Sequence, residues 1–352
     1  MIWDGVRLLI WTNFCHSDYF ALRIALRACS NRCCQRTLSV QHRKHTLPAV
    51  RCLTVSFKLF MKASQSDFIQ VRGLRYHIRR WGRPDAPLLC MLHGWMDVSA
   101  SFQFVVDELA LDWHVVAPDW RGFGLTQRVP ADVYWFPDYL ADLDEILRHY
   151  AGERAINLLG HSMGGYVAGL YAGVRPQRIS KLINLEGFGP GVTQPDDAPG
   201  RYAKWLDELQ IVPTMHSYPT QEAVATRLKK NNPRLTQARA GFLAQHWASE
   251  NSAGRWNILG DPAHKLINPV LPRVEEMLAC WRRISAPVLC VEAVDTNMWQ
   301  WMGGKEAMRD EIDRRVACLA DARLERIADA GHMLHHDQPQ LLASMIEQFL
   351  AE

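Results

Sequence analysis

The segment from Ala155 to Gly165, with the sequence Ala-Ile-Asn-Leu-Leu-Gly-His-Ser-Met-Gly-Gly, decides the fold. Its first half is an apolar run typical of a buried strand, and it passes directly into Gly160-x-Ser162-x-Gly164. A serine at so sharp a turn needs neighbours without bulk two residues away, which glycine provides. The pattern predicts a strand–turn–helix unit that presents Ser162 at a strand's carboxyl end, near a helix N-terminus whose positive partial charge favours an oxyanion.

Strand and helix patterns alternate on both sides of this segment. Apolar runs predict strands at 88–92, 114–117, 155–159, 179–185, 287–291 and 323–327, after an edge hairpin of 67–72 and 74–81. Helical periodicity predicts helices over 98–109, 138–150, 163–174, 304–319 and 339–350. Such alternation indicates an α/β fold whose mainly parallel sheet is covered by helices on both faces.

Residues 188–272 break this alternation. They are rich in proline, tryptophan, arginine and polar residues, and they show helical patterns only in pieces such as 201–209 and 221–229. We interpret them as a helical lid inserted into a core that is formed by residues 61–187 and 273–352.

The first sixty residues differ from the rest in charge and in cysteine content. They hold nine Lys/Arg against two acidic residues, so they carry a net charge of +7 within a chain whose total is +3. Five of the nine cysteines also lie there. We interpret residues 1–60 as a disordered or non-native extension, with Met61 as a plausible true start.

The composition of the remaining chain excludes several classes of function. It contains no apolar run of about 18 residues, so we expect no membrane-spanning helix and no membrane partner. It has no basic stripe, so nucleic acid is not an expected partner. An odd number of cysteines without a disulfide framework favours a reducing compartment, so the cytoplasm is the expected location. Cys90 and Cys290 lie in apolar runs and are expected to be buried; the oligomeric state stays open.

Three further segments, taken with the Ser162 turn, resemble the α/β-hydrolase superfamily. Met91–Trp95 (Met-Leu-His-Gly-Trp) is similar to the family's H-G-x oxyanion loop, and Asp119–Thr126 is similar to its D-x-R-G-x-G-x-S/T turn. Ala330–Leu334 (Ala-Gly-His-Met-Leu) resembles the loop of the catalytic histidine before the last helix. The resemblance covers about 66–187 and 273–351, and it implies a mostly parallel eight-stranded sheet with serine hydrolase chemistry.

A serine hydroxyl is a poor nucleophile unless a base takes its proton, and the base needs an acid to orient it. With Ser162 as the nucleophile, His332 is the expected base because it follows the last predicted strand. His335 and His336 fall within or at the start of the final helix, where we expect them at the surface. His93 and His161 flank the glycines of their turns and are expected to hold those loops by hydrogen bonds.

The acid has two candidates. The resemblance places it after the strand at 287–291, where Asp295 follows, although Glu292 stands in place of the glycine of the family's usual G-x-x-D pattern. Glu186 is the alternative, because some relatives place the acid after the earlier strand at 179–185. The chain order Ser…Asp…His favours Asp295, with Glu186 then anchoring the lid or supporting the site.

The oxyanion hole is expected from the backbone N–H groups of Trp95 and Met163. The side chains of Trp95, Trp120, Phe123 and Trp205 are candidates for lining an apolar substrate pocket. No cofactor or metal is implied, because the triad and the oxyanion hole supply the nucleophile and the electrostatics.

These residues predict a serine hydrolase that cleaves an ester-like bond of a small apolar molecule through an acyl-enzyme. An acyltransferase and a cofactor-free perhydrolase are alternatives that use the same triad. A non-catalytic signalling protein on a hydrolase fold is a third, and retention of all three triad members disfavours it.

Overall fold

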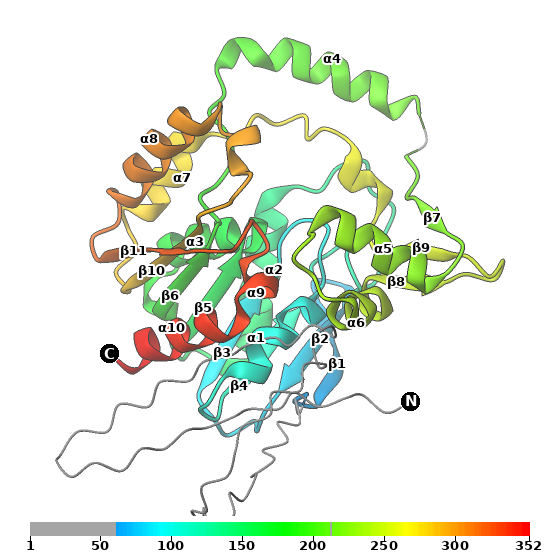
Figure 1. Ribbon diagram of the computed structural model, residues 1–352. Helices are drawn as coiled ribbons and strands as arrows, with labels where there is room; N and C mark the ends of the chain where they lie inside the picture. The colour runs from blue at the N-terminus through cyan, green and yellow to red at the C-terminus, as the bar shows by residue number, and fades with distance from the viewer. Residues whose placement is uncertain (1–60, 212) are drawn as a thin grey trace, which may run out of the picture. The chain divides into compact units, whose positions relative to one another are not determined.

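The computed structural model describes residues 61–211 and 213–352 (Figure 1). The extension predicted at 1–60 lies outside the described residues. Within the described residues, no helix is both long enough and apolar enough to cross a bilayer.

The centre of the fold is an eight-stranded sheet with the strand order β1-β2-β4-β3-β5-β6-β10-β11. β1 and β2 form the antiparallel hairpin, and β2 joins β4 antiparallel, whereas every pairing from β4 to β11 is parallel. The predicted α/β fold with a mostly parallel eight-stranded sheet is therefore confirmed. The strands are β1 (Ser64–Val71), β2 (Leu74–Trp81), β3 (Leu88–Leu92), β4 (His114–Pro118), β5 (Ile156–His161), β6 (Ile179–Leu185), β10 (Val288–Ala293) and β11 (Ala322–Ile327).

Helices cover both faces of this sheet and close two apolar cores. On one face α2, α3, α7 and α8 cover the sheet (Figure 1), and Leu158 of β5, Tyr171 of α3 and Trp281 of α7 are buried in the core between them. On the other face α1 and α10 pack together over a second core that includes Val291 and Ile346. The helices are α1 (Gln103–Glu108), α2 (Phe136–Ala151), α3 (Met163–Val174), α7 (Val274–Trp281), α8 (Lys305–Val316), the short α9 (Leu334–Asp337) and α10 (Pro339–Ala351).

The two cysteines predicted to be buried are in the strands of this core. Cys90 in β3 and Cys290 in β10 are fully buried, and burial raises the pKa of each thiol to about 12. Both behave as small apolar side chains, as the sequence predicts.

The segment 188–272 contains its own small elements between β6 and α7. A helix, α4, has no buried residue and lies across the top of the view in Figure 1. Two further helices pack on each other beside a three-stranded sheet of order β7-β9-β8. The elements are α4 (Ala198–Leu209), β7 (Ser217–Tyr218), α5 (Gln221–Asn231), α6 (Gln237–Trp247), β8 (Ala248–Glu250) and β9 (Trp256–Ile258). The helical character is as predicted, and the role of a lid stays a prediction.

Candidate active site

Ser162 lies in the turn between β5 and α3, in a backbone conformation that an L-amino acid rarely adopts. Its φ is 51° and its ψ is −117°. The neighbouring glycines make this possible, because a Cβ on Gly160 would lie 2.3 Å from the Gly164 carbonyl oxygen, and one on Gly164 would lie 2.2 Å from the Leu92 carbonyl oxygen. Strain of this kind persists only where the surroundings enforce it, and it tends to mark functional positions.

His332 links Ser162 to a buried carboxylate. The Nε2 atom of His332 lies 2.9 Å from Ser162 Oγ, and its Nδ1 atom lies 2.8 Å from an oxygen of Glu186. The sequence therefore brings together a hydroxyl, an imidazole and a carboxylate from the ends of β5, β11 and β6. This geometry lets the imidazole accept the hydroxyl proton while the carboxylate holds the ring.

The Glu186 carboxylate is fully buried and receives three hydrogen bonds. The Ala293 backbone N–H donates to Oε1 at 2.7 Å, and the Thr296 hydroxyl donates to Oε2 at 2.6 Å, beside His332 Nδ1. Such donors compensate for the loss of water around a buried charge. The Ala293 and Thr296 donors both come from the end of β10 and the residues after it, so this segment supports the carboxylate that follows β6.

The prediction that Asp295 contacts His332 is wrong in this structure. Asp295 is half exposed, and its carboxylate accepts a hydrogen bond from Arg234 at 2.6 Å. Glu186, the rival in the sequence analysis, occupies the position beside His332 instead. Chain order, on which the preference for Asp295 was based, does not separate the two candidates, because both residues lie between Ser162 and His332.

The path of β10 explains why Asp295 points elsewhere. Glu292 does not begin a turn but pairs with Arg326 in the β10–β11 ladder, and the Val294 N–H continues the contact to the Ile327 carbonyl. The Glu292 side chain is buried in an ion pair with Arg309 at 2.6 Å. The strand thus continues past the position where the family pattern has glycine. At its end the Ala293 N–H and the Thr296 hydroxyl contact Glu186, whereas the Asp295 side chain contacts Arg234.

The predicted oxyanion hole is compatible with the backbone around Ser162. A Cβ added to Gly94 would lie 3.2 Å from the Ser162 Cβ, so the backbone at Gly94 passes close to the Ser162 side chain. Met163 is the first residue of α3, where backbone N–H groups have no acceptor within the helix. Their role as oxyanion donors stays a prediction.

His335 and His336 are buried, so their predicted surface position is wrong. Both lie in α9, which packs against α10 and against the turn at 99–102 instead of facing solvent. His93 and His161 do hold their loops as predicted: the Trp120 N–H donates to His93 Nε2, and His161 Nε2 lies 2.8 Å from the His332 carbonyl oxygen.

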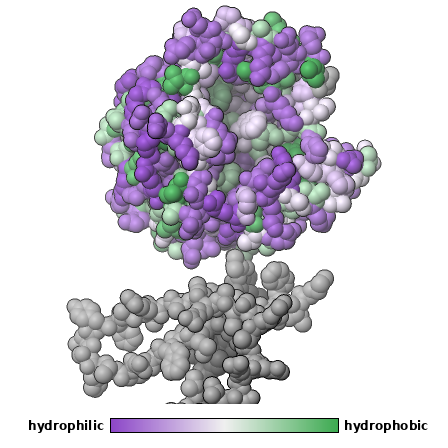
Figure 2. All heavy atoms as spheres, turned by 45° about the horizontal axis from the view of Figure 1, so that its top comes forward, coloured by the Kyte–Doolittle hydropathy of each residue, from purple (hydrophilic) through white to green (hydrophobic). Residues whose placement is uncertain are grey.

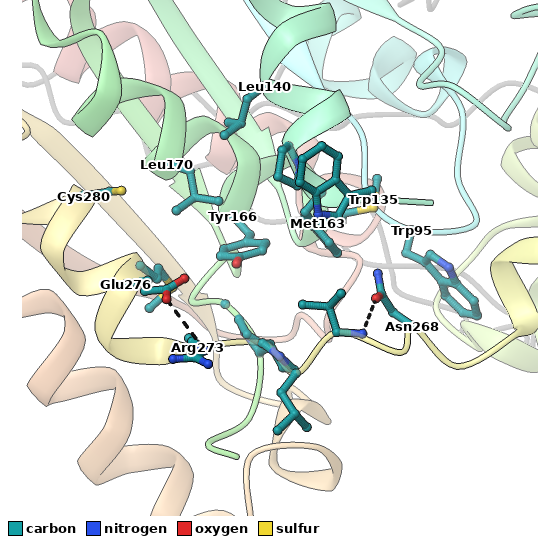
Figure 3. A pocket seen from close by; sticks show the side chains of 18 of the residues that line it. Trp95, Trp135, Leu140, Met163, Tyr166, Leu170, Asn268, Arg273, Glu276 and Cys280 are labelled. Carbon is teal, nitrogen blue, oxygen red and sulfur yellow. Dashed lines mark hydrogen bonds and ion pairs between the residues drawn. The ribbon is translucent and has the colours of Figure 1, made fainter. Parts of the chain in front are cut away.

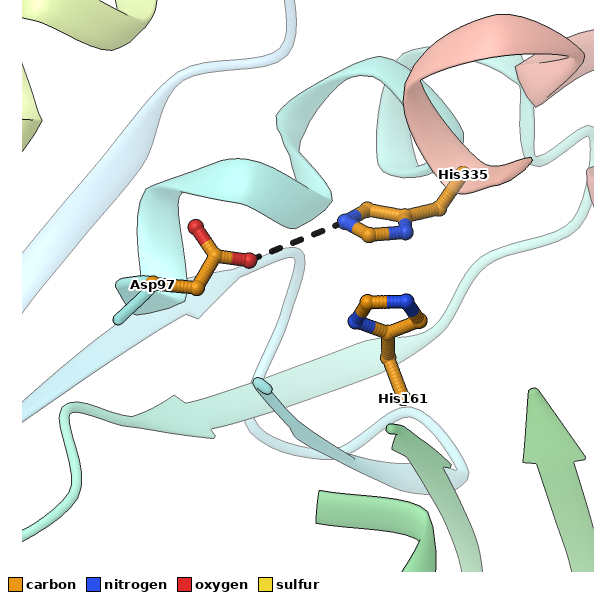
Figure 4. Close-up of side chains that lie close together, drawn as sticks. All are labelled: Asp97, His161 and His335. Atoms are coloured by element: carbon orange, nitrogen blue, oxygen red, sulfur yellow. Dashed lines mark ion pairs between the residues drawn. The ribbon is translucent and has the colours of Figure 1, made fainter. Parts of the chain in front are cut away.

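Asp97, His161 and His335 form a buried cluster (Figure 4), and the centroid of the His161 ring lies 5.0 Å from that of the His332 ring. Their ligand atoms lie within 4.8 Å of one another, and Asp97 Oδ2 lies 3.8 Å from His335 Nε2. Ligands of a tetrahedral zinc ion lie roughly 3.4 Å apart, so this cluster would have to contract to bind one. The cluster instead brings together three segments next to the site: Asp97 is two residues after Trp95, His161 ends β5 directly before Ser162, and His335 in α9 is three residues after His332.

Burial and neighbouring charges set the protonation of this cluster. Burial lowers the pKa of His161 and of His336 well below the usual histidine value, and His335 lowers both further. Burial alone would raise the pKa of the Asp97 carboxyl, but the nearby imidazoles, that of His335 first, lower it overall. Burial thus disfavours the charged forms of His161 and His336, whereas the surrounding imidazoles favour the charged form of Asp97.

Two cavities meet at Ser162, and they share Trp95, Ser162 and Trp301 in their walls. The first cavity has a volume of about 530 Å³ and the second about 690 Å³. Figure 2 shows a hollow in this face of the molecule, where pale and green side chains are surrounded by hydrophilic ones. Segment 188–272 contributes wall residues to both cavities, among them Val270 in the first and Asn231 in the second.

Of the predicted pocket residues, Trp95 alone has the expected place, in the walls of both cavities. The prediction is wrong for Trp120 and Phe123, because both side chains are fully buried in the first apolar core. Trp120 donates its indole N–H to the His93 carbonyl, which supports the loop from beneath. Trp205 lies on α4 outside both walls.

Sequence analysis missed several wall residues that come from separate segments. The first cavity is lined by Trp135, Leu140, Tyr166 and Leu170, and the second by Asn232 and Arg234. Leu140 and Leu170 show only an ordinary helical period in the sequence. That signal cannot tell a residue in a cavity wall from one in the core.

Known proteins resemble this chain in both sequence and structure. A family model described as the alpha/beta hydrolase fold matches residues 87–339. A serine hydrolase-like protein of Danio rerio is 27% identical over 314 residues, which cover 86% of this chain and 94% of that protein. Serine hydrolase-like protein 2 of Homo sapiens is 25% identical, and the alignment covers 77% of this chain and 89% of that protein.

Among solved structures, the thioesterase domain from the curacin biosynthetic pathway superposes with a TM-score of 0.72 at 24% identity. That superposition covers 81% of this chain and 99% of the domain. This likeness in structure supports the fold, in agreement with the family model. The chain therefore belongs to the alpha/beta hydrolase fold family, and within it this hydrolase is similar to the serine hydrolase-like proteins.

Proposed function

We propose that the protein hydrolyses esters or thioesters through an acyl-enzyme on Ser162. One observation carries this proposal: the continuous chain of contacts from Ser162 Oγ through His332 to Glu186, with distances of 2.9 Å and 2.8 Å. His332 is the general base, and Glu186 is the acid that orients it and stabilises its charged form.

The reaction follows from these positions. Ser162 Oγ bonds to the acyl carbon as its proton passes to His332 Nε2, and the same proton then goes to the leaving oxygen or sulfur as its bond to carbon breaks. A water molecule next gives a proton to His332 and attacks the acyl-enzyme. The bond to Oγ breaks, Ser162 regains its proton, and the acid is released.

The backbone N–H groups of Trp95 and Met163 would stabilise the negative oxygen of both tetrahedral intermediates. Donors already held by the fold need no reorganisation when the charge develops, and each contributes about 3 kcal/mol in comparable sites. The α3 N-terminus adds favourable partial charge in the same direction. No step requires a metal or an organic cofactor.

We also propose that segment 188–272 is the lid of this site. Its residues Arg201, Asn268 and Val270 line the first cavity, and Leu228, Asn231 and Trp247 line the second. A cover of this kind limits the size of the substrate and excludes water from the reacting groups.

Labelling with a fluorophosphonate probe tests the proposed activity. The probe is expected to bond to Ser162, to be found there by peptide mass spectrometry, and to abolish ester hydrolysis. Ser162→Ala should lose labelling and about 10⁵-fold or more of kcat. A wild-type protein that folds but neither labels nor hydrolyses any ester in an acyl-chain series would contradict the proposal and favour a non-catalytic role.

A further inference from the structure

The cluster of Asp97, His161 and His335 contains ligand atoms that the protein leaves unused (Figure 4). Each of the three side chains is at most 3% exposed. Within residues 61–211 and 213–352, no group hydrogen bonds to Asp97 Oδ2, to His161 Nδ1 or to either ring nitrogen of His335. Buried polar atoms are normally paired, because burying one without a partner is costly. The cluster therefore suits a ligand that accepts electron pairs from all three side chains.

The tautomer of His161 leaves its Nδ1 atom available to such a ligand. Nε2 lies 2.8 Å from the His332 carbonyl oxygen, which only accepts hydrogen bonds, so Nε2 carries the proton and Nδ1 keeps its lone pair. An imidazole that binds a metal usually donates its other N–H to a carbonyl or carboxylate oxygen, which fixes the ring. His161 thus has the outer contact that is typical of a metal ligand.

Asp97 is held by one oxygen and keeps the other available. Its Oδ1 atom accepts hydrogen bonds from the Ser101 hydroxyl and, at 3.1 Å, from the Trp247 indole N–H. Its Oδ2 atom lies 3.8 Å from His335 Nε2, which is too far for a hydrogen bond. Carboxylates that bind metals are oriented by outer hydrogen bonds in the same way.

The chemistry of these donors favours zinc. Two imidazole nitrogens and a carboxylate oxygen suit zinc, whereas magnesium and calcium prefer oxygen ligands alone, and three protein ligands leave one position for a water molecule. An ion can reach the cluster from the second cavity, because Asp97 and Ser101 are in its wall. None of the three cluster residues is among the described residues that line the first cavity, part of which Figure 3 shows.

Zinc binding would also change the active site. The ligands of a tetrahedral zinc ion lie roughly 3.4 Å apart, whereas the cluster atoms lie within 4.8 Å of one another, so they have to approach. His161 directly precedes Ser162 and contacts the His332 carbonyl, so its movement disturbs the 2.9 Å contact between Ser162 and His332. A misplacement of about 1 Å in such a site can lower the rate about 100-fold.

We propose that Asp97, His161 and His335 form an inhibitory zinc site: a zinc ion that enters from the second cavity binds to these three side chains and slows hydrolysis at Ser162. The ion takes no part in breaking the substrate's bond. Zinc binding does not depend on the proposed function, whereas the inhibition rests on it.

Isothermal titration calorimetry of the full chain with zinc chloride, after treatment with EDTA, tests the binding. His335→Gln and Asp97→Asn each remove one ligand with little change in volume, and the second variant serves if the first fails to fold. Loss of an outer partner weakens metal binding about 10- to 100-fold, so loss of a ligand should weaken it about 100-fold or more. Residues 1–60 also contain cysteines and histidines, so the readout is the zinc site lost relative to the wild type, not the total zinc.

Two further variants make this test specific. Trp247→Phe removes the indole N–H that holds Asp97 and should weaken zinc binding about tenfold. His149→Gln removes an exposed histidine of α2 and should bind zinc as the wild type does. Cobalt provides a spectroscopic signature, because a tetrahedral site intensifies its visible absorption; this signal should be present in His149→Gln and absent in His335→Gln.

Ester hydrolysis in the presence of zinc tests the inhibition. Saturating zinc should lower the wild-type kcat about 10- to 100-fold, with KM changed less than about twofold, and EDTA should restore the rate. Magnesium should not inhibit. Each variant is compared with its own rate in EDTA: zinc should lower kcat less than about twofold in His335→Gln and Asp97→Asn, and as in the wild type in His149→Gln.

Equal zinc affinity in the wild type and in both ligand variants would overturn the proposal. Inhibition that competes with the substrate and persists in His335→Gln would overturn it as well, because zinc would then bind to His332 itself. A protein that hydrolyses no ester, but whose variants lose one zinc site, would support the zinc site and reject the hydrolase activity. The failure of the proposed function is thus distinguished from the failure of the zinc site.

Discussion

The ends of β6 and β10 each carry a carboxylate that could have served His332, and the structure treats the two in opposite ways. Glu186, directly after β6, is fully buried and receives hydrogen bonds from Ala293, Thr296 and His332. Asp295, two residues after β10, is half exposed and paired with Arg234. The difference shows that the acid of such a site is selected by where hydrogen-bond donors converge, because a buried carboxylate without them would be too costly.

Replacing each carboxylate by its amide gives the largest expected difference between the two strand ends. Glu186→Gln should lower kcat about 10³- to 10⁴-fold, because an amide can donate to Nδ1 and so favour the wrong tautomer of His332. Asp295→Asn is the matched control and should keep kcat within about twofold for acetyl esters of benzyl alcohol, because Asp295 does not contact the triad. The two variants are compared by steady-state kinetics.

The assignment of Glu186 as the acid that orients His332 fails if Glu186→Gln retains most of its activity. It fails equally if Asp295→Asn shows the larger loss. Thermal unfolding of both proteins checks that a loss of activity is not a loss of folded protein.

The next largest effect concerns the imidazoles that flank the triad. His161 and His336 have pKa values well below the usual histidine value because burial disfavours their charged forms. Below about pH 6.5 the unfolded chain binds protons at these residues that the folded chain does not, so each can lower the free energy of unfolding by up to about 1.4 kcal/mol per pH unit. The contribution of the two neutral histidines to the free energy of unfolding is thus fully present above about pH 6.5 and is lost as the pH falls below that value.

Urea unfolding at pH 7.5 and at pH 5.5 measures this decline. In His336→Gln the unfolded chain should bind up to one proton fewer relative to the folded chain, because glutamine does not titrate. The free energy of unfolding should therefore depend less steeply on pH. A free energy of unfolding that does not change between the two pH values would contradict the neutral, buried state of these histidines.

A smaller effect is expected at Thr296, the residue through which β10 supports the acid of β6. Thr296→Val removes the hydroxyl that donates to Glu186 at 2.6 Å but keeps the shape of the side chain. Loss of one hydrogen bond to a buried charge should lower kcat about tenfold and reduce stability by roughly 1.5–3 kcal/mol. Thr296→Ser keeps the hydroxyl and should restore most of both; a serine variant as impaired as the valine variant would mean that packing, not the hydrogen bond, matters.

The smallest effect is expected at Glu292, which stands where the family pattern has glycine. Its buried carboxylate pairs with Arg309 at 2.6 Å and Arg326 at 3.1 Å, so Glu292→Gln should lower the free energy of unfolding by about 1 kcal/mol. The kcat of the folded protein should not change, because the side-chain contacts of Glu292 are with Arg309 and Arg326 and not with Ser162, His332 or Glu186. A large fall in kcat at unchanged stability would place Glu292 in the catalytic site and weaken the contrast between the two strand ends.

Much of the fold was open to prediction because it depends on local patterns. The apolar runs at 88–92 and 179–185 coincide with β3 and β6, and the small-residue stretch at 163–174 coincides with α3. Around Ser162 the glycine spacing is a steric requirement of one turn, so a few adjacent residues are enough to reveal it. The contacts of Ser162 with His332 were likewise expected from motif order.

The errors concern burial and contact between distant segments. The sequence around His336 and Trp120 does not indicate whether these side chains lie at the surface, in the core or in a cavity wall. In the structure both are buried. Chain order could not separate Glu186 from Asp295, because both satisfy it.

The sequence by itself therefore determined the α/β sheet, the strained serine turn and the histidine loop, since each depends on the periodicity or steric demands of neighbouring residues. Only the tertiary structure decided which carboxylate lies beside His332 and which side chains face the two cavities. Those outcomes depend on hydrogen bonds and packing between segments more than a hundred residues apart, such as the 2.7 Å contact from Ala293 to Glu186, and no local pattern encodes them.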